Sequence, residues 1–431
     1  MKALWLCPIM LPGFAGAFNE KRNPKGGWIT GLFSCLKDHI SIDICCPAKE
    51  CLGWGKELID GTMVYTLKRT EDCTDTLKEI LISSDPDIIH IWGTEKKMSL
   101  DMVNAAEQLG MLDRVVINIQ GLASICSRYH FFCNLPVSVI QSESPGEYKY
   151  KVSLQNQRDN MALQGSYEIE AFKKVKHAVG RTDWDYACVT QINPDIHYHK
   201  CSETLRSIFY ERKWEYDRCE KHSIFVSQSH APFKGFHMML EAMPLILKKY
   251  PDAKLYTTGK KPVLPVTFEE KCMEMAYPSY IAGLIKDYGL EECVEFTGFL
   301  GEKKMCERYL SSNVAVSASS IENSSNSVGE AMLLGMPVVA SDVGGTNNFI
   351  EHKKNGYLYP ADAPYMLAHY VCEVFGDAEK AAAMGERARQ FALECFDKAA
   401  SIERYKEIYE AIVGSATEQR AGRKSGNSQV E

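Results

Sequence analysis

Short apolar segments with the length of β-strands alternate with helical segments along almost the whole chain, and this alternation constrains the fold more than any other feature. In the first half the predicted strands are 2–7, 42–46, 63–67, 88–92, 115–119 and 178–180, and the predicted helices are 28–38, 74–83, 99–109 and 161–176. A helix between successive strands makes a βαβ unit, whose strands form a parallel sheet covered by helices on both faces.

The same pattern begins again after a charged, interrupted segment at 206–222. The predicted strands are then 223–227, 254–258, 294–297, 314–318 and 337–341, with helices at 235–249, 280–288, 302–310, 328–334, 364–375 and 378–413, the last breaking near 396–397. The chain thus predicts an α/β protein with two Rossmann-like, doubly wound domains, 1–205 and 222–395, joined by a linker at 206–221 and facing a central cleft. The polar segment 416–431 is expected to be a disordered tail.

Composition excludes several classes of protein. The 431 residues are 45% hydrophobic, which fits a globular chain, and 49 basic against 56 acidic residues give a net charge of −7, which argues against a nucleic-acid-binding role. The 16 cysteines include no CxxC pair, so we expect a reducing compartment and no structural zinc site. The apolar stretch 3–10 is too short to cross a membrane, and we interpret it as a strand, not as a signal peptide.

Three loop segments that contain glycine precede helices and are candidates for binding an anion. Gly26–Gly27 lie before helix 28–38, where a backbone without side chains can approach a phosphate, although a simple turn is the alternative. Lys234–Gly235 follow strand 223–227 and its loop, and the ammonium group could reach a diphosphate or be an ordinary surface lysine. Gly344–Gly345 we interpret as mainly structural, with Thr346 capping the next helix.

The stretch 317–335 (SASSIENSSNSVGEAMLLG) is the most informative loop. Its small polar residues lead into a helix, and the free N–H groups of such a helix start favour a phosphate. Glu330 would lie one turn into the helix, where it could accept two hydrogen bonds from a ribose diol, and Glu322 would accept bonds from sugar hydroxyls. The alternative is a capping box, in which Glu330 bonds back to the amide of Ser327.

Other segments have plainer interpretations. His197 and His199 fit alternation along a short strand better than a metal site, and Thr182 with Asp185 fits a helix cap. Residues 125–156 do not fit the strand–helix alternation, so we expect either a loop that binds an acceptor or partner, or an excursion that only packs.

Several motifs together resemble the retaining GT-B glycosyltransferases of family 4 (glycosyl transferases group 1), which include sucrose and glycogen synthases and lipid mannosyltransferases. The motifs are the E-x7-E pair Glu322/Glu330 in ENSSNSVGEAMLLGMPVVASDVGGTNNFI, the upstream FVSQSHAPFKGFHMMLEA, and GGW after the first strand. The resemblance covers nearly the whole chain and is strongest from Ser223 to Pro360. It implies a GT-B fold in which the C-terminal domain holds a nucleotide sugar and a last helix, 396–415, crosses back onto the N-terminal domain.

The resemblance also implies roles for individual residues. Glu330 would bind the ribose hydroxyls, while Glu322, facing the donor hexose, and Lys234, on the diphosphate, would be the catalytic pair. The remaining donor-binding positions that it implies are Gly27 over the phosphate, Gly298 and Leu300 at the nucleobase, and Ser325, Asn326, Ser327 and Val328 at the sugar and diphosphate.

Two positions depart from the family pattern. Gln228 and Ser229 stand where members carry an arginine, so one cation on the leaving diphosphate is missing, and Gln228 can only donate neutral hydrogen bonds to the donor. Gln120, before Gly121, replaces a histidine near the donor sugar and cannot act as an acid. These changes could mark a subfamily variant, which we favour, or weakened activity.

We therefore expect a retaining, metal-independent hexosyltransferase without a cofactor. It would move a hexose from a nucleotide-diphosphate sugar to a saccharide or polyprenyl-linked acceptor, in bacterial surface polysaccharide biosynthesis. We expect it in the cytoplasm, with peripheral contact at the inner face of the membrane as an option, and without a nucleic-acid partner. The alternatives are a non-catalytic nucleotide-sugar-binding or scaffold protein of the same fold, and a nucleotide-sugar epimerase.

Overall fold

The fold is taken from a computed structural model, which describes residues 1–18, 27–49, 51 and 53–427. The chain forms two compact units: unit 1 comprises Met1–Ser124, Leu163–Thr204 and Phe396–Glu431, and unit 2 comprises Ile125–Ala162 and Leu205–Cys395. Each unit contains one largely parallel β-sheet with helices packed against it, as the alternation of strands and helices predicts.

Unit 1 contains an eight-stranded sheet in the order β3-β4-β2-β1-β5-β6-β7-β8. Its strands are β1 Lys2–Leu6, β2 Ser41–Pro47, β3 Trp54–Ile59, β4 Thr62–Leu67, β5 Ile88–Trp92, β6 Val115–Asn118, β7 His177–Gly180 and β8 His197–Lys200. Neighbouring strands are parallel except β3 and β4, which form a hairpin. Asp60 and Gly61 turn the hairpin with φ of 47° and 79°, the left-handed conformation that a tight two-residue turn requires.

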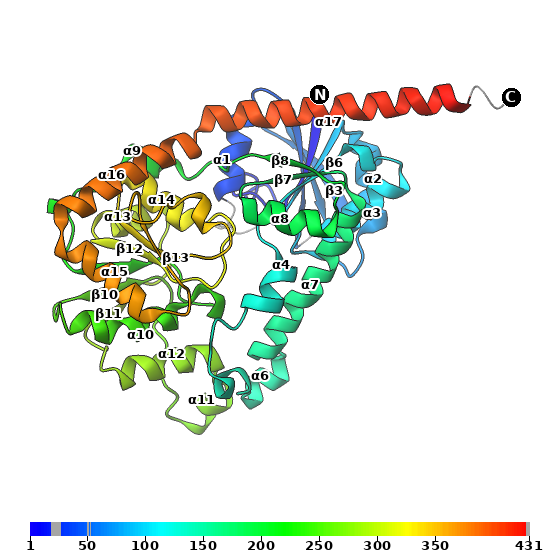
Figure 1. Ribbon diagram of the computed structural model, residues 1–431. Coiled ribbons are helices and arrows are strands. Elements are labelled where there is room, and N and C mark those ends of the chain that lie inside the picture. The colour runs from blue at the N-terminus through cyan, green and yellow to red at the C-terminus, as the bar shows by residue number, and fades with distance from the viewer. Residues whose placement is uncertain (19–26, 50, 52, 428–431) are drawn as a thin grey trace. The chain divides into compact units, whose positions relative to one another are not determined.

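The helices of unit 1 connect these strands (Figure 1). They are α1 Gly27–Leu36, α2 Thr74–Ser84, α3 Lys97–Gln108, α8 Asp183–Ile192 and α17 Lys398–Asn427, together with the later part of α7 Leu154–Lys174. Thr182 and Asp185 form the expected capping box at the start of α8. Residues 416–427, expected to be a disordered tail, continue α17.

Helix α17 closes the core of unit 1 with two buried tyrosines. Trp5 Nε1 donates to the Tyr409 hydroxyl at 2.9 Å, and His90 Nδ1 lies 2.5 Å from the same oxygen. Asn118 Nδ2 donates to the Tyr405 hydroxyl at 2.8 Å. Because these five side chains are almost fully buried, the end of the chain is held to three central strands by polar contacts inside an apolar core.

Unit 2 contains a six-stranded parallel sheet in the order β11-β10-β9-β12-β13-β14. Its strands are β9 Ser223–Val226, β10 Lys254–Thr257, β11 Val294–Phe296, β12 Val314–Ser317, β13 Val338–Ser341 and β14 Tyr357–Tyr359. The helices that connect and cover them are α9 Ser207–Glu211, α10 Phe236–Leu247, α11 Phe268–Cys272, α12 Ala276–Asp287, α13 Glu302–Leu310, α14 Asn326–Leu334, α15 Pro364–Gly376 and α16 Ala378–Cys395. α10 packs with α12 and α15, whereas α14 packs with α9 and α16.

Residues 125–162, which the sequence analysis includes in the N-terminal domain, pack with unit 2. They contain the short helices α5 Val137–Ile140 and α6 Pro145–Tyr150 and the first part of α7, and they follow the short helix α4 Ala123–Ile125. Leu135 and Leu154 are buried in the core of unit 2, which explains the association. Likewise, residues 206–221, expected to be a linker, are part of unit 2.

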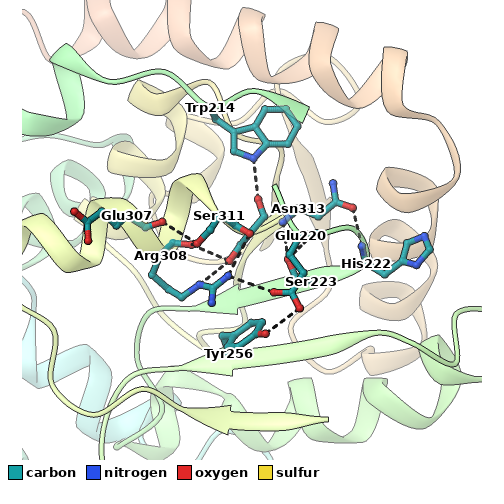
Figure 2. A network of polar contacts seen from close by, with 10 residues as sticks. Trp214, Glu220, His222, Ser223, Tyr256, Glu307, Arg308, Ser311 and Asn313 are labelled. Carbon is teal, nitrogen blue, oxygen red and sulfur yellow. Dashed lines mark hydrogen bonds and ion pairs between the residues drawn. The ribbon is translucent and has the colours of Figure 1, made fainter. Parts of the chain in front are cut away.

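A polar network connects the segment before β9 to the sheet of unit 2, near the amino ends of its strands (Figure 2). Trp214 Nε1 donates to the carbonyl of Ser312 at 2.8 Å, and the Tyr256 hydroxyl donates to Glu220 at 3.0 Å. Arg308 lies over the Tyr256 ring, 3.8 Å from its centroid. Because the strands are parallel, their amino ends lie opposite their carboxyl ends, where ligands bind in such sheets. We therefore interpret the network as structural.

Within the part of the chain that the structure describes, no helix combines the length and the apolar character needed to cross a bilayer.

Candidate functional site

The site predicted in unit 2 lies where the winding of the sheet reverses. The chain passes from β9 to β10 on one side and from β12 to β13 on the other, although β9 and β12 are neighbours. The loops after β9 and β12 therefore diverge, and open α/β sheets bind ligands at such a point. Lys234 belongs to the first loop and Glu322 to the second.

Lys234 and Glu322 form an ion pair across these two loops. Lys234 Nζ lies 2.6 Å from Glu322 Oε1, and the Ser319 hydroxyl donates to the same oxygen at 2.6 Å. The two charged side chains are 19% and 12% exposed, so they are largely shielded from water but still reachable. The predicted cation and the predicted sugar-facing acid are thus brought together.

Two glycines make this close approach of the loops possible. Gly235 has φ +67°, and a Cβ there would lie 1.8 Å from the carbonyl oxygen of Ala318. Gly344 has φ +51°, and its Cβ would lie 2.1 Å from the carbonyl oxygen of Glu322, to which the amide of Gly345 donates at 2.9 Å. Any larger residue would displace the main chain that carries Lys234 or Glu322. The Gly344–Gly345 turn is structural, as expected, and lies directly against the site, but Thr346 does not cap the next helix: it is the first residue of a short 3-10 helix whose N-cap is Gly345.

The loop that carries Glu322 leads into the start of α14, which offers backbone donors. Ser325 is the N-cap, its side chain makes no capping bond, and its hydroxyl lies 3.0 Å from that of Ser327. The first N–H groups of a helix have no acceptor within the helix and favour an anion. Asn326, Ser327 and Val328, three of the predicted donor-binding residues, form this first turn.

Glu330 does not form the capping box considered as an alternative, because the helix begins before Ser327. Its carboxylate is instead held by Arg206: Nε lies 2.6 Å from Oε1, and a terminal guanidinium nitrogen lies 2.6 Å from Oε2. Glu330 is 4% exposed. Burial raises the pKa of the Glu330 carboxyl, and the bonds and charge of Arg206 oppose that rise.

The remaining predicted positions of unit 2 are spread along the carboxyl edge. Gln228 is exposed in the loop after β9. Gly298, with φ +75°, pairs with Gly259 through two backbone hydrogen bonds of 3.0 and 3.2 Å, and half-buried Leu300 follows before α13.

Two predicted site residues belong to unit 1. Gln120 follows β6 and donates to the Asn118 side chain at 2.6 Å, while its carbonyl accepts from Arg181 at 3.0 Å. Gly27 is the first residue of α1, and Gly26 lies outside the described residues.

The irregular segment 125–162 contacts the loops of the site. The Ser320 hydroxyl donates to the carbonyl of His130 at 2.7 Å, and the ring of Phe131 lies 6.0 Å from that of Phe233, next to Lys234. His237, just after Gly235, bonds to the carbonyl of Cys133 at 2.6 Å. This segment therefore supports the site loops by packing.

Two other features were considered as sites. His197 lies on the strand β8, as expected, and the described residues contain no group of three or more His, Cys, Asp or Glu placed to hold a metal. A pocket of about 710 Å³ lies between residues 347–355 and α16, and no predicted site residue lines it.

Sequence reasoning missed two residues of the site. Ser319 lies within the loop already marked by its small polar residues, so a close reading of that loop could have found it. Arg206 carried no signal, because it is 124 positions from Glu330 and lies in a segment that looks like a linker.

Comparisons with known proteins concern the family and the fold of the chain. Residues 211–391 match the family model for glycosyl transferases group 1. Poly(ribitol-phosphate) alpha-N-acetylglucosaminyltransferase of Staphylococcus aureus (strain COL) is 27% identical over 179 residues, which are 41% of this chain and 33% of that protein. The chain spans between about a third and a half of the length of the curated relatives it matches.

Solved structures match nearly the whole chain. Sucrose-phosphate synthase from Thermosynechococcus elongatus matches with a TM-score of 0.68 and 18% identity, covering 96% of this chain and 100% of the other. Anabaena Alr3699/HepE in complex with UDP and glucose matches with a TM-score of 0.63 and 16% identity, covering 95% and 100%. Identity this low establishes the fold alone, which confirms the predicted pair of Rossmann-like domains. Residues 211–391 thus match the family model for glycosyl transferases group 1, and the chain has the GT-B fold.

Proposed function

We propose that this protein is a glycosyltransferase that uses a nucleotide-diphosphate sugar. The observation that carries the proposal is the Lys234–Glu322 pair at the sheet's switch point, whose second loop leads into α14. A cation and open helix amides suit a diphosphate, and an adjacent carboxylate suits the hydroxyls of the attached hexose. The family match over residues 211–391 supports this reading.

The residues suggest how transfer would proceed. As the bond between the sugar and the diphosphate breaks, negative charge grows on the leaving oxygen, and Lys234 with the α14 amides would stabilise it. Glu322 would hold the hexose, and Ser319 would orient that carboxylate. The departing phosphate oxygen would accept the proton of the acceptor hydroxyl, whose oxygen bonds to the anomeric carbon on the same face that the diphosphate leaves, so the configuration is retained. We propose this retaining, metal-independent route without a cofactor.

The acceptor and the setting are also proposals. The relative named as a poly(ribitol-phosphate) N-acetylglucosaminyltransferase supports a saccharide or polymer acceptor and a role in surface polysaccharide synthesis. The complex of Alr3699/HepE with UDP and glucose makes UDP-glucose a suitable first donor to test. A cytoplasmic location, with peripheral contact at the membrane, and a polyprenyl-linked acceptor complete the proposal.

The test is release of nucleoside diphosphate from a panel of nucleotide sugars, with and without saccharide acceptors. We expect turnover with one donor, and a fall of about 10²–10³-fold in kcat for Glu322→Gln, the range for losing a preorganised polar group. Glu269→Gln, an exposed acid on α11, is the matched control and should keep full activity. Equal turnover by Glu322→Gln and the control would contradict the proposal.

A second candidate is a non-catalytic nucleotide-sugar-binding protein, favoured by Gln228 in place of the arginine found in similar enzymes. The same panel separates the two: a donor that raises the melting temperature but is never cleaved, even with acceptors present, favours the binding protein.

A further inference from the structure

Arg206 contacts Glu330, one of the predicted donor-binding residues, through two hydrogen bonds. It meets Glu330 through two parallel bonds of 2.6 Å, one to each carboxylate oxygen. This fork geometry is the strongest form of an arginine–carboxylate contact and fixes the plane of the carboxylate. The Arg206 side chain is 26% exposed and that of Glu330 is 6% exposed, so the contact is largely shielded from water.

The backbone that carries Arg206 is fixed against the helix that carries Glu330. Arg206 is the N-cap of α9, and its guanidinium lies 4.8 Å from the centroid of the buried Phe209 ring. Further along, the amide of Trp214 donates to the carbonyl of Leu334, the last residue of α14, at 2.7 Å. The segment that carries Arg206 is thus anchored to α14 at both Glu330 and Leu334.

The other groups that face Glu330 come from α13. Glu302, Cys306 and Tyr309 all interact electrostatically with its carboxylate, and Glu302 repels it. Among the described residues, Arg206 is the cation that acts on this carboxyl. A buried carboxylate without that cation would take up a proton more readily.

We propose that Arg206 is the positioning residue for nucleotide ribose recognition: it keeps Glu330 ionised and turns it so that the oxygen lone pairs left over from the fork accept the two ribose hydroxyls. Each carboxylate oxygen has two lone pairs, and the fork uses one on each. The inference rests on the proposed function, since it takes the ligand to be a ribonucleotide. Arg206 itself need not touch the nucleotide.

The test compares UDP, ADP and GDP with their 2′-deoxy counterparts by isothermal titration between pH 6 and 9. For the nucleotide that binds, the wild type should prefer the ribose form by about tenfold, a typical value for one lost hydrogen bond to a charged group, with little change across this range. In Arg206→Met the ribose preference should disappear at pH 6–7 and return as the pH rises, because deprotonation of Glu330 restores the acceptor. Arg206→Lys, which keeps the cation but not the fork, should lose part of the preference without gaining the pH dependence.

A double-mutant cycle separates this role from direct phosphate contact. In a Glu330→Gln background, Arg206→Met should change the affinity by less than twofold, since no charge remains to be maintained. An equal loss in both backgrounds, or a wild-type ribose preference in Arg206→Met at all pH values, would overturn the inference. No binding of any nucleotide to the wild type would instead overturn the proposed function, and the inference with it. Should Arg206→Met fail to fold, the Arg206→Lys profile alone decides, and an unchanged ribose preference there would contradict the proposal.

Discussion

At the scale of single residues, two glycines decide where the charged pair of the site lies. Gly235 and Gly344 both have positive φ and both meet a carbonyl oxygen closer than any Cβ could tolerate. The oxygens belong to Ala318 and Glu322, which flank the loop after β12. The approach of the two loops, and with it the 2.6 Å contact of Lys234 and Glu322, depends on the missing side chains.

We predict that Gly235→Ala lowers both stability and donor binding. The left-handed conformation alone costs an alanine about 1–3 kcal/mol, and the contact with Ala318 forces the loop away from β12. Urea unfolding and donor titration measure the two effects. Gly283→Ala in α12 is the control: a Cβ there meets nothing within 4 Å, so it should be neutral or stabilise by up to about 1 kcal/mol. Equal behaviour of the two variants would contradict this account.

The individual residues also show how much of the site could be predicted from the sequence. Lys234 and Glu322 lie in loops, and Glu330 lies in the helix that follows. The alternation of strands and helices in the sequence places all three near the carboxyl ends of the parallel strands. The partner of Glu330 could not be predicted, because Arg206 meets it only through tertiary packing of α9 on α14. The capping box at Ser327 fits the local sequence, but the helix extends back to Asn326 and makes it impossible.

At the scale of elements, α17 shows how a helix distant in sequence completes a core. Its tyrosines reach β1, β5 and β6 through buried hydrogen bonds, including Trp5 Nε1 to the Tyr409 hydroxyl. The family resemblance anticipates such a helix, but it does not anticipate which polar contacts hold it.

We predict that Tyr409→Phe destabilises unit 1 by about 1–3 kcal/mol, since it leaves Trp5 Nε1 and His90 Nδ1 without their common partner in a buried site. Chemical denaturation monitored by tryptophan fluorescence measures the change. Tyr365→Phe, on an exposed side chain of α15, should change the free energy of unfolding by less than about 0.5 kcal/mol. A loss for Tyr409→Phe no larger than for this control would count against the role of the network.

The strands that were missed have weaker sequence patterns than those that were predicted. β1, β5 and β13 are buried along almost their whole length and read as continuous apolar runs. β3 is an exposed hairpin strand with Lys56 and Glu57, and β14 has only three residues, so neither has a strong pattern. The association of residues 125–162 with unit 2 depends on long-range packing of Leu135 and Leu154, which periodicity does not encode.

At the scale of the whole molecule, each unit contains a buried histidine whose ionisation opposes folding. Burial lowers the pKa of His90 in unit 1 to about 3 and that of His237 in unit 2 to about 4. Unfolded histidines titrate near 6.5, so between these values the unfolded chain binds more protons than the folded one. The free energy of unfolding should therefore fall as the pH drops below about 6.5.

We predict that the free energy of unfolding falls by up to about 1.4 kcal/mol per pH unit for each of the two histidines between pH 6 and 4.5. Urea unfolding at several pH values measures the slope, and each variant is compared with the wild type so that carboxylates cancel. His90→Asn, which keeps a polar group near the position of Nδ1, should reduce the slope for unit 1, and His237→Gln should do so for unit 2. Variants with the wild-type slope would show that these histidines are not the groups responsible.

The central claim is that the switch point of unit 2 binds the diphosphate of a nucleotide sugar. The most direct measurement is the affinity of three proteins, the wild type, Lys234→Met and Lys260→Met, for UDP-glucose or for whichever donor the panel selects. Lys260 is an exposed lysine of the same unit that lies outside the predicted site. We predict that Lys234→Met weakens binding by at least about tenfold, the size of one charged hydrogen bond, while Lys260→Met binds like the wild type. Equal affinity of all three proteins for the donor would contradict the claim.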